Sequence, residues 1–174
     1  MVRILSDFVL RTRFKKKLKL LTSVSKSNRK KLKSIVILVS GNYEVEENLF
    51  VDFAKAFKVP TQNITIVVFN KNKIPLKDTS LGQRIECSKE MIDFWGNFPQ
   101  KFNDFFNKEV DLLINYFDDN SLLPCYVSVF CKAKLRLGFS STQHALNDLI
   151  LNVNPLNTDL FLSESTKYLK SILK

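Results

Sequence analysis

Short apolar runs along the chain predict buried β-strands. A run rich in Ile, Leu and Val without polar alternation is typical of a strand that is buried on both faces of a parallel sheet. Residues 83–88 predict an added strand within an otherwise irregular segment, residues 71–98. The five clearest runs cover residues 34–39 (SIVILV), 63–70, 110–117, 134–140 and 148–153.

Segments with helical spacing lie between these runs. Leu49, Phe53 and Phe57 recur every four residues, after acidic residues that suit the first turn of a helix. Because strands and helices alternate, right-handed crossovers should join parallel strands. The predicted fold class is α/β, a Rossmann-like three-layer domain with a mainly parallel sheet of about five strands, preceded by a basic N-terminal helical arm. Helices are predicted over residues 46–57, 99–108 and 155–174. A further helix is predicted to begin near Asp119 or Asn120, with Pro124 in its first turns.

Charge divides the chain into a cationic arm and a near-neutral body. Residues 1–33 hold twelve Lys and Arg against one acid, a net charge of +11, while the whole chain has a net charge of +10. Residues 34–174 hold fifteen against sixteen, which gives −1. We therefore expect an arm over residues 1–33 and a single α/β domain over residues 34–174, with the basic character confined to the arm.

The arm predicts a short basic amphipathic helix. Leu10, Phe14, Leu18 and Leu21 fall on one stripe, and cations fall on the other side. The stripe suits three arrangements: packing on the protein's own body, lying at an anionic membrane surface, or placing the cations along RNA phosphates. The residues expected to meet an anionic partner, either RNA and the ribosome or the inner membrane leaflet, are Arg11, Arg13, Lys15, Lys16, Lys17, Lys19, Arg29, Lys30 and Lys31.

Several common functions lack their sequence signals. The arm offers only Phe8 and Phe14 for base stacking, so sequence-specific reading of DNA or RNA is not indicated. The three cysteines lack the C-x-x-C spacing, and there is one histidine, so no metal site is expected. One glycine follows the first strand, where a dinucleotide site needs three, so no cofactor is expected either. Without a signal peptide or an 18-residue apolar run, the expected location is cytoplasmic, with a peripheral position at the inner membrane as an alternative.

The polar residues that follow the strands are the candidates for a ligand site. In open parallel sheets ligands bind outside the carboxyl ends of the strands. Asp118 and His144 would form an acid–base pair if the third and fourth strands are neighbours, while Asp118 and Asp119 alternatively cap the next helix. Trp95 lines a ligand pocket or, as tryptophans in loops often do, anchors its loop to the core. The ligand-binding candidates are Asn42, Asn115, Ser140 and Ser141.

The chain carries a basic stretch at Asn28 to Lys30, the strand DLLINY at Asp111 to Tyr116, the stretch AKLRLGF at Ala133 to Phe139 and NDLI at Asn147 to Ile150. In these elements it resembles a family of functionally uncharacterised proteins of about 170 residues from Bacteroidota. That family has a basic N-terminal segment, a DLLINYY-like strand, an AKxKxGF stretch and an NDLI stretch. The resemblance implies the fold and a bacterial cytosolic setting, without an activity.

About thirty residues, 111–140, also look like the N-terminal half of heptosyltransferase-type glycosyltransferases. Those enzymes bind their donor mainly with a second domain, so the shared fragment is best explained as common βαβ packing. Two functions stay open from the sequence. The favoured one is a non-enzymatic domain that docks on an anionic partner through its arm. The alternative is a small enzyme or ligand-binding domain that acts on a phosphorylated sugar or nucleotide-like ligand at the strand ends. The oligomeric state is open.

Overall fold

A computed structural model gives the fold of the chain. It describes residues 2–21, 31–41, 43, 45–69, 82–118 and 121–173.

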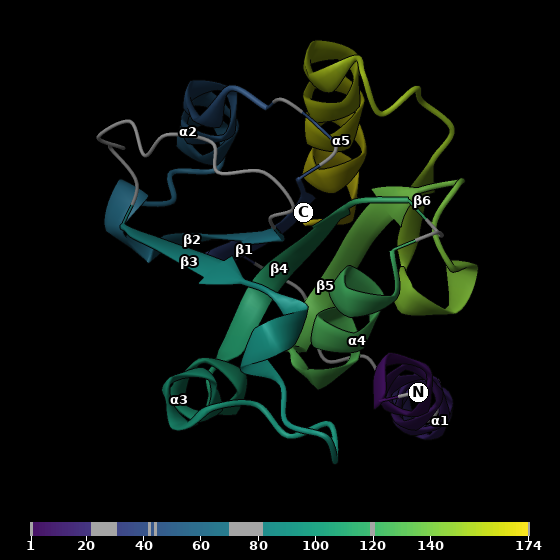
Figure 1. Cartoon of the computed structure of the whole chain (residues 1–174). Helices are drawn as coiled ribbons and strands as arrows, with labels where there is room; N and C mark the ends of the chain where they lie inside the picture. Colours follow the sequence, from purple (N-terminus) through teal and green to yellow (C-terminus); the bar gives the residue numbers. More distant parts are fainter. Residues whose placement is uncertain are drawn as a thin grey trace.

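One six-stranded parallel sheet forms the centre of the molecule (Figure 1). Its order, β3-β2-β1-β4-β5-β6, is the strand order of Rossmann folds. The α/β prediction is confirmed, and residues 83–87 do add a strand, which pairs with β2 in parallel from Thr65 opposite Gln83. The strands are β1 (Ile35–Ser40), β2 (Ile64–Phe69), β3 (Gln83–Cys87), β4 (Glu109–Tyr116), β5 (Lys132–Phe139) and β6 (Leu149–Leu151).

Helices cover both faces of the sheet (Figure 1). Helices α2 and α5 lie on one face, and α1, α3 and α4 lie on the other. Alternate residues of the central strands therefore point into two separate apolar cores, which is why β1 and β2 are nearly continuous apolar runs. The helices are α1 (Val2–Leu21), α2 (Glu47–Ala56), α3 (Gln100–Asn107), α4 (Leu122–Phe130) and α5 (Thr158–Ile172).

Helix α4 is buried on all sides. Residues 124–129 are all buried, because the sheet lies under one side of α4 and α1 packs against it. The helix begins at Leu122, later than the predicted start, and residues 119 and 120 lie outside the described residues. Its N-cap is Ser121, so the interpretation of Asp118 as the capping residue is wrong. Pro99 likewise directly precedes α3 instead of lying in its first turn.

The apolar stripe of α1 packs on the protein's own body. Leu10 is only 2% exposed, and Phe14, Leu18 and Leu21 contact the core on the α4 side of the sheet. The first of the three predicted arrangements of the stripe is therefore present. This packing leaves the opposite side of α1 facing solvent.

Asp111 fixes the start of β1 to β4 and β5. Its carboxylate accepts hydrogen bonds from the backbone N–H groups of Lys33 (2.8 Å) and Ser34 (3.2 Å) and from Lys134 Nζ (2.7 Å). Burial by itself would raise the pKa of Asp111, but the bonds from Lys134 and Lys33 outweigh it, and the pKa lies below its usual value of 3.8. The aspartate of the DLLINY strand is thus a structural clamp.

Replacing Asp111 by asparagine is expected to lower the free energy of unfolding by about 2 kcal/mol at neutral pH. A carboxylate whose pKa is lowered by folding stabilises the protein above its unfolded-state pKa. That contribution is lost as the pH falls through the lower folded-state pKa. Urea unfolding of both proteins should therefore show a difference that is full at neutral pH and shrinks below about pH 4. A difference of the same size at both pH values would contradict this role.

Candidate functional site

The carboxyl ends of β1 and β4 form the point where the strand order reverses, the usual ligand crevice of this fold. In this protein Tyr43, which follows β1, contacts residues at the carboxyl end of β4 across this point. The Tyr43 hydroxyl donates to Asp118 Oδ2 (3.1 Å), and its ring packs edge-on against Tyr116 with centroids 5.9 Å apart. Burial, followed by the charge of Asp118, raises the pKa of Tyr43 to about 12. The phenol therefore keeps its proton at neutral pH and holds the two loops together.

Asn115 is fully buried and bonded within the protein. Its amide nitrogen donates to Asn147 Oδ1 (2.7 Å), and its oxygen accepts from Ser128 Oγ (2.9 Å) of α4. Asn147 in turn donates to Thr142 Oγ1 (2.7 Å). This chain of bonds joins β4, α4 and the loop after β5, so the amide of Asn115 has a structural role instead of facing a ligand.

The glycine of the KLRLGF strand makes room for this network. A Cβ atom at Gly138 would lie 2.5–2.7 Å from the side chain of Asn147, which lies over it. Next along the chain, Asp148 accepts from the backbone N–H of Arg136 (3.0 Å). The buried guanidinium of Arg136 donates to the carbonyl oxygens of Ser128 and Cys131 at the end of α4. The stretches that contain Gly138 and Asn147 to Ile150 therefore hold the loop between β5 and β6 against the sheet.

The predicted acid–base pair is not joined by any hydrogen bond among the described residues. Asp118 accepts from Tyr43 and from Ser121 Oγ (3.2 Å), while the exposed ring of His144 meets the carbonyl oxygen of Ser140 (Nε2 to O, 3.0 Å). Ser140 Oγ donates to Asn152 Oδ1 (2.9 Å), and Ser141 is exposed. Asn42, the remaining ligand-binding candidate, lies outside the described residues.

An open pocket of about 460 Å³ lies between the N-terminal ends of α2 and α5. Glu46 and Asp159 both line it, and two carboxylates disfavour a phosphorylated ligand there. Over the described ranges, no group of three or more His, Cys, Asp or Glu side chains is placed to hold a metal ion. Cys131 is fully buried, and burial raises the pKa of its thiol to about 12, which does not suit a nucleophile.

The outward side of α1 carries the exposed cations. Arg11, Lys15 and Lys16 are exposed and make no hydrogen bond or ion pair with any described residue. Lys19 and Lys31 are exposed as well. Three described members have partners: Arg13 donates to Asn97 Oδ1 (3.0 Å), Lys17 Nζ lies 5.0 Å from the centre of the Phe130 ring, and Lys19 also takes part in an interaction. Arg29 and Lys30 lie outside the described residues.

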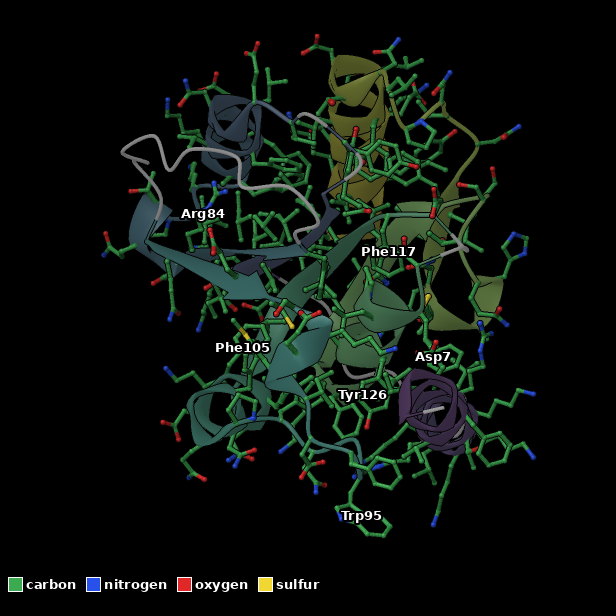
Figure 2. All side chains as sticks on the ribbon, in the orientation of Figure 1. Asp7, Arg84, Trp95, Phe105, Phe117 and Tyr126 are labelled. Carbon is green, nitrogen blue, oxygen red and sulfur yellow. The ribbon has the colours of Figure 1, made fainter. Side chains whose placement is uncertain are left out.

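The loop of residues 93–97 lies beside α1 (Figure 2). Arg13 donates to the carbonyl oxygen of Trp95, and the buried hydroxyl of Tyr126 donates to that of Gly96 (2.6 Å). Asn97 closes the loop through two hydrogen bonds to Asp93. The loop, α1 and α4 therefore form one connected unit.

Replacing Gly96 by alanine is expected to lower the free energy of unfolding by about 1–2 kcal/mol. Gly96 has φ +82°, and a Cβ atom there would lie 2.9 Å from the Tyr126 hydroxyl and 3.2 Å from Arg13 Cδ. Thermal unfolding measures the change. Because the clash is partly with the hydroxyl, Tyr126→Phe combined with Gly96→Ala should cost less than the two single changes added together. Full additivity, or an unchanged Tm for Gly96→Ala, would contradict this packing.

Comparison with known sequences now adds the family. A family of unknown function, DUF6913, matches the chain over residues 7–172, from within α1 to the end of α5. The chain belongs to DUF6913. No curated protein and no solved structure matches it. The sequence-based expectation of an uncharacterised family is thereby confirmed, and the DUF6913 match includes most of the cationic helix.

Trp95 is the residue of this DUF6913 chain that the sequence interpretation placed least well. Its ring neither lines the pocket between α2 and α5 nor packs in the core: it is 69% exposed and points away from the body (Figure 2). The backbone of the loop, instead of the indole, provides the anchor through Arg13 and Tyr126. The sequence near Trp95 could not predict this anchoring, because Arg13 lies 82 residues from Trp95 and Tyr126 lies 30 residues from Gly96. None of the described helices is long and apolar enough to cross a membrane.

Proposed function

We propose that this protein is a non-enzymatic α/β domain that docks on an anionic surface through the outward side of α1. The observation that carries the proposal is the state of Arg11, Lys15 and Lys16. All three are exposed and make no hydrogen bond or ion pair with the described residues, on a helix whose other side is packed into the core. Cations kept on an ordered helix are available to an external partner.

The energetics suit reversible binding. Each cation close to an anionic surface contributes about 1 kcal/mol, so Arg11, Lys15 and Lys16 together contribute about 3 kcal/mol. The helix is already packed, so docking does not require the folding of a disordered segment, which otherwise weakens such binding. The attraction acts within about 10 Å in dilute salt and weakens as salt is added.

The strand-end edge gives the alternative function less support. Tyr43 and Asp118 bond to each other across the strand ends, and the Asn115 side chain is bonded to Ser128 and Asn147. The open pocket nearby is lined by two carboxylates, which disfavour a phosphorylated sugar or nucleotide. We therefore assign the candidate function to α1.

The proposed setting is a bacterial cytosol, as the resemblance to Bacteroidota proteins implies. The anionic surface is then either ribosomal RNA or the inner membrane leaflet. Both carry dense phosphate charge, which cations recognise without sequence-specific contacts.

Co-sedimentation of the full chain tests this function. The protein is mixed with ribosomes, with vesicles containing phosphatidylglycerol, and with neutral phosphatidylcholine vesicles, at low and at high salt. At least one of the two anionic particles should retain the protein at low salt and release it at high salt, while neutral vesicles should not retain it. If neither anionic particle retains the chain at low salt, the function is refuted. Deleting α1 is not a suitable control, because it would expose the core that Leu10 covers.

A further inference from the structure

We propose that the partner is an anionic lipid bilayer and that Trp95 and Phe8 enter its interface when α1 docks. This inference rests on the proposed function and makes it more specific. It starts from large apolar side chains that lie exposed beside the cations. Phe8 is 68% exposed, Trp95 is 69% exposed and Leu20 is 55% exposed.

The cations and the aromatic ring of α1 share one side of the helix. Phe8, Arg11, Lys15 and Lys19 are three, four and four residues apart, so they form one stripe. Leu10 and Phe14, which pack into the core, lie on a different side of the helix from this stripe. Phe8 therefore projects from the N-terminal end of this cationic stripe, at an exposed position that would ordinarily hold a polar residue.

Trp95 lies on an anchored loop at the flank of α1 that carries Arg13, on the other edge of the outward side from the Phe8 stripe. Arg13, on the flank of α1, donates to the Trp95 carbonyl oxygen, and Tyr126 holds the neighbouring Gly96 carbonyl. The ring itself contacts Phe94 edge-on, with centroids 5.3 Å apart, and Phe94 is also partly exposed. Figure 2 shows Trp95 pointing outward at the end of the molecule where α1 lies. The backbone is fixed while the indole is presented to the outside.

Acidic side chains near this surface are mostly occupied. Asp7 pairs with Lys89, and Asp93 accepts two hydrogen bonds from Asn97. These bonds and the nearby charge of Arg13 hold the pKa of Asp93 below its usual value. The surface thus combines exposed cations with apolar side chains, and Asp7 and Asp93 beside it have partners inside the protein.

A bilayer fits this combination better than RNA does. Tryptophan and phenylalanine settle at the boundary between headgroups and acyl chains, and cations attract anionic headgroups at the same depth. An aliphatic side chain such as Leu20 gains from entering hydrocarbon and gains nothing from base stacking. Helix α1, about 30 Å long, would lie in the plane of the membrane. No described helix crosses it.

Fluorescence of Trp95 tests the inference, because it is the only tryptophan in the chain. Full-length protein is added to phosphatidylcholine vesicles with about a quarter phosphatidylglycerol, to pure phosphatidylcholine vesicles, and to ribosomal RNA. On the anionic vesicles we expect the emission maximum to move to shorter wavelength, and lipids with brominated acyl chains should quench it. Neutral vesicles should leave the spectrum unchanged.

Single substitutions make the test independent of the spectrum. Trp95→Ser and Phe8→Ser should each weaken vesicle flotation by about tenfold. The matched control is Leu156→Ser, which removes a side chain that is 78% exposed in the loop before α5, on the other side of the sheet. It should leave flotation unchanged. Circular dichroism before flotation confirms that each variant is folded.

The outcomes separate the inference from the proposed function. Flotation without a spectral shift or bromine quenching overturns insertion, while docking on an anionic surface stands. Binding to ribosomal RNA with no flotation overturns the lipid partner, while docking again stands. Binding to neither refutes the proposed function and the inference together. Equal losses for Leu156→Ser and Trp95→Ser would overturn the assignment of the surface.

Discussion

Replacing Arg11, Lys15 and Lys16 together by glutamate is expected to weaken binding to anionic vesicles by at least about a hundredfold. Each change removes an attraction of about 1 kcal/mol and adds a repulsion of similar size, so a hundredfold is a conservative expectation. The three residues are exposed and make no hydrogen bond or ion pair with described residues. The free energy of unfolding should therefore change by less than about 1 kcal/mol. Vesicle flotation and urea unfolding measure the two effects.

The matched control reverses the same number of charges elsewhere. Lys55, Lys167 and Lys170 lie on α2 and α5, which cover the other face of the sheet (Figure 1). Their replacement by glutamate changes the net charge by the same amount. We expect flotation of this variant to fall by far less than that of the α1 variant. Equal losses in the two variants would mean that net charge, and not the α1 surface, drives binding.

Replacing Asn115 by alanine is expected to lower the free energy of unfolding by about 3 kcal/mol, the larger of the two stability effects predicted for polar residues. The change leaves the buried Ser128 hydroxyl and the Asn147 amide oxygen without their partner and opens a small cavity in the α4 side of the core. Urea unfolding at neutral pH measures it.

Ser141→Ala is the control for Asn115→Ala. Ser141 follows the neighbouring strand and is exposed, so its replacement should change the free energy of unfolding by less than about 0.5 kcal/mol. If Asn115→Ala unfolds at the same urea concentration as the wild type, the buried network does not stabilise the fold. Asn115 would then return as a candidate for ligand binding.

Most of the fold could be predicted from local pattern. Residues 35–40, 64–69 and 109–116 form strands because they are apolar runs that suit a sheet covered on both faces. The start of α4 was misplaced because Asp118 is also a typical capping residue, whereas Ser121 holds the N-cap position. The sequence predicts β3 only as an added strand, because β3 is short and partly exposed and has little apolar pattern.

The candidate site was harder to predict because its contacts are distant in sequence. The apolar stripe of α1 can be predicted from the sequence. The surface that α1 contacts, whether the protein's own body, a membrane or RNA, cannot, because amphipathic spacing does not identify the partner. Asn115 was assigned to a ligand from its place after a strand, yet its bonds run to residues 13 and 32 positions away. The sequence predicts that Trp95 lines a ligand pocket or anchors its loop to the core, whereas Arg13 and Tyr126 hold the backbone of that loop and the ring is exposed.

The central claim is that the cations of α1 bind an anionic surface. Its most direct test is the salt dependence of the dissociation constant for anionic vesicles, measured side by side for the wild type and the Arg11→Glu, Lys15→Glu, Lys16→Glu variant between about 0.05 and 0.5 M salt. The wild type should bind at low salt and weaken steeply as salt rises, while the variant should bind weakly at every concentration. Equal affinity and equal salt dependence of the two proteins would contradict the claim.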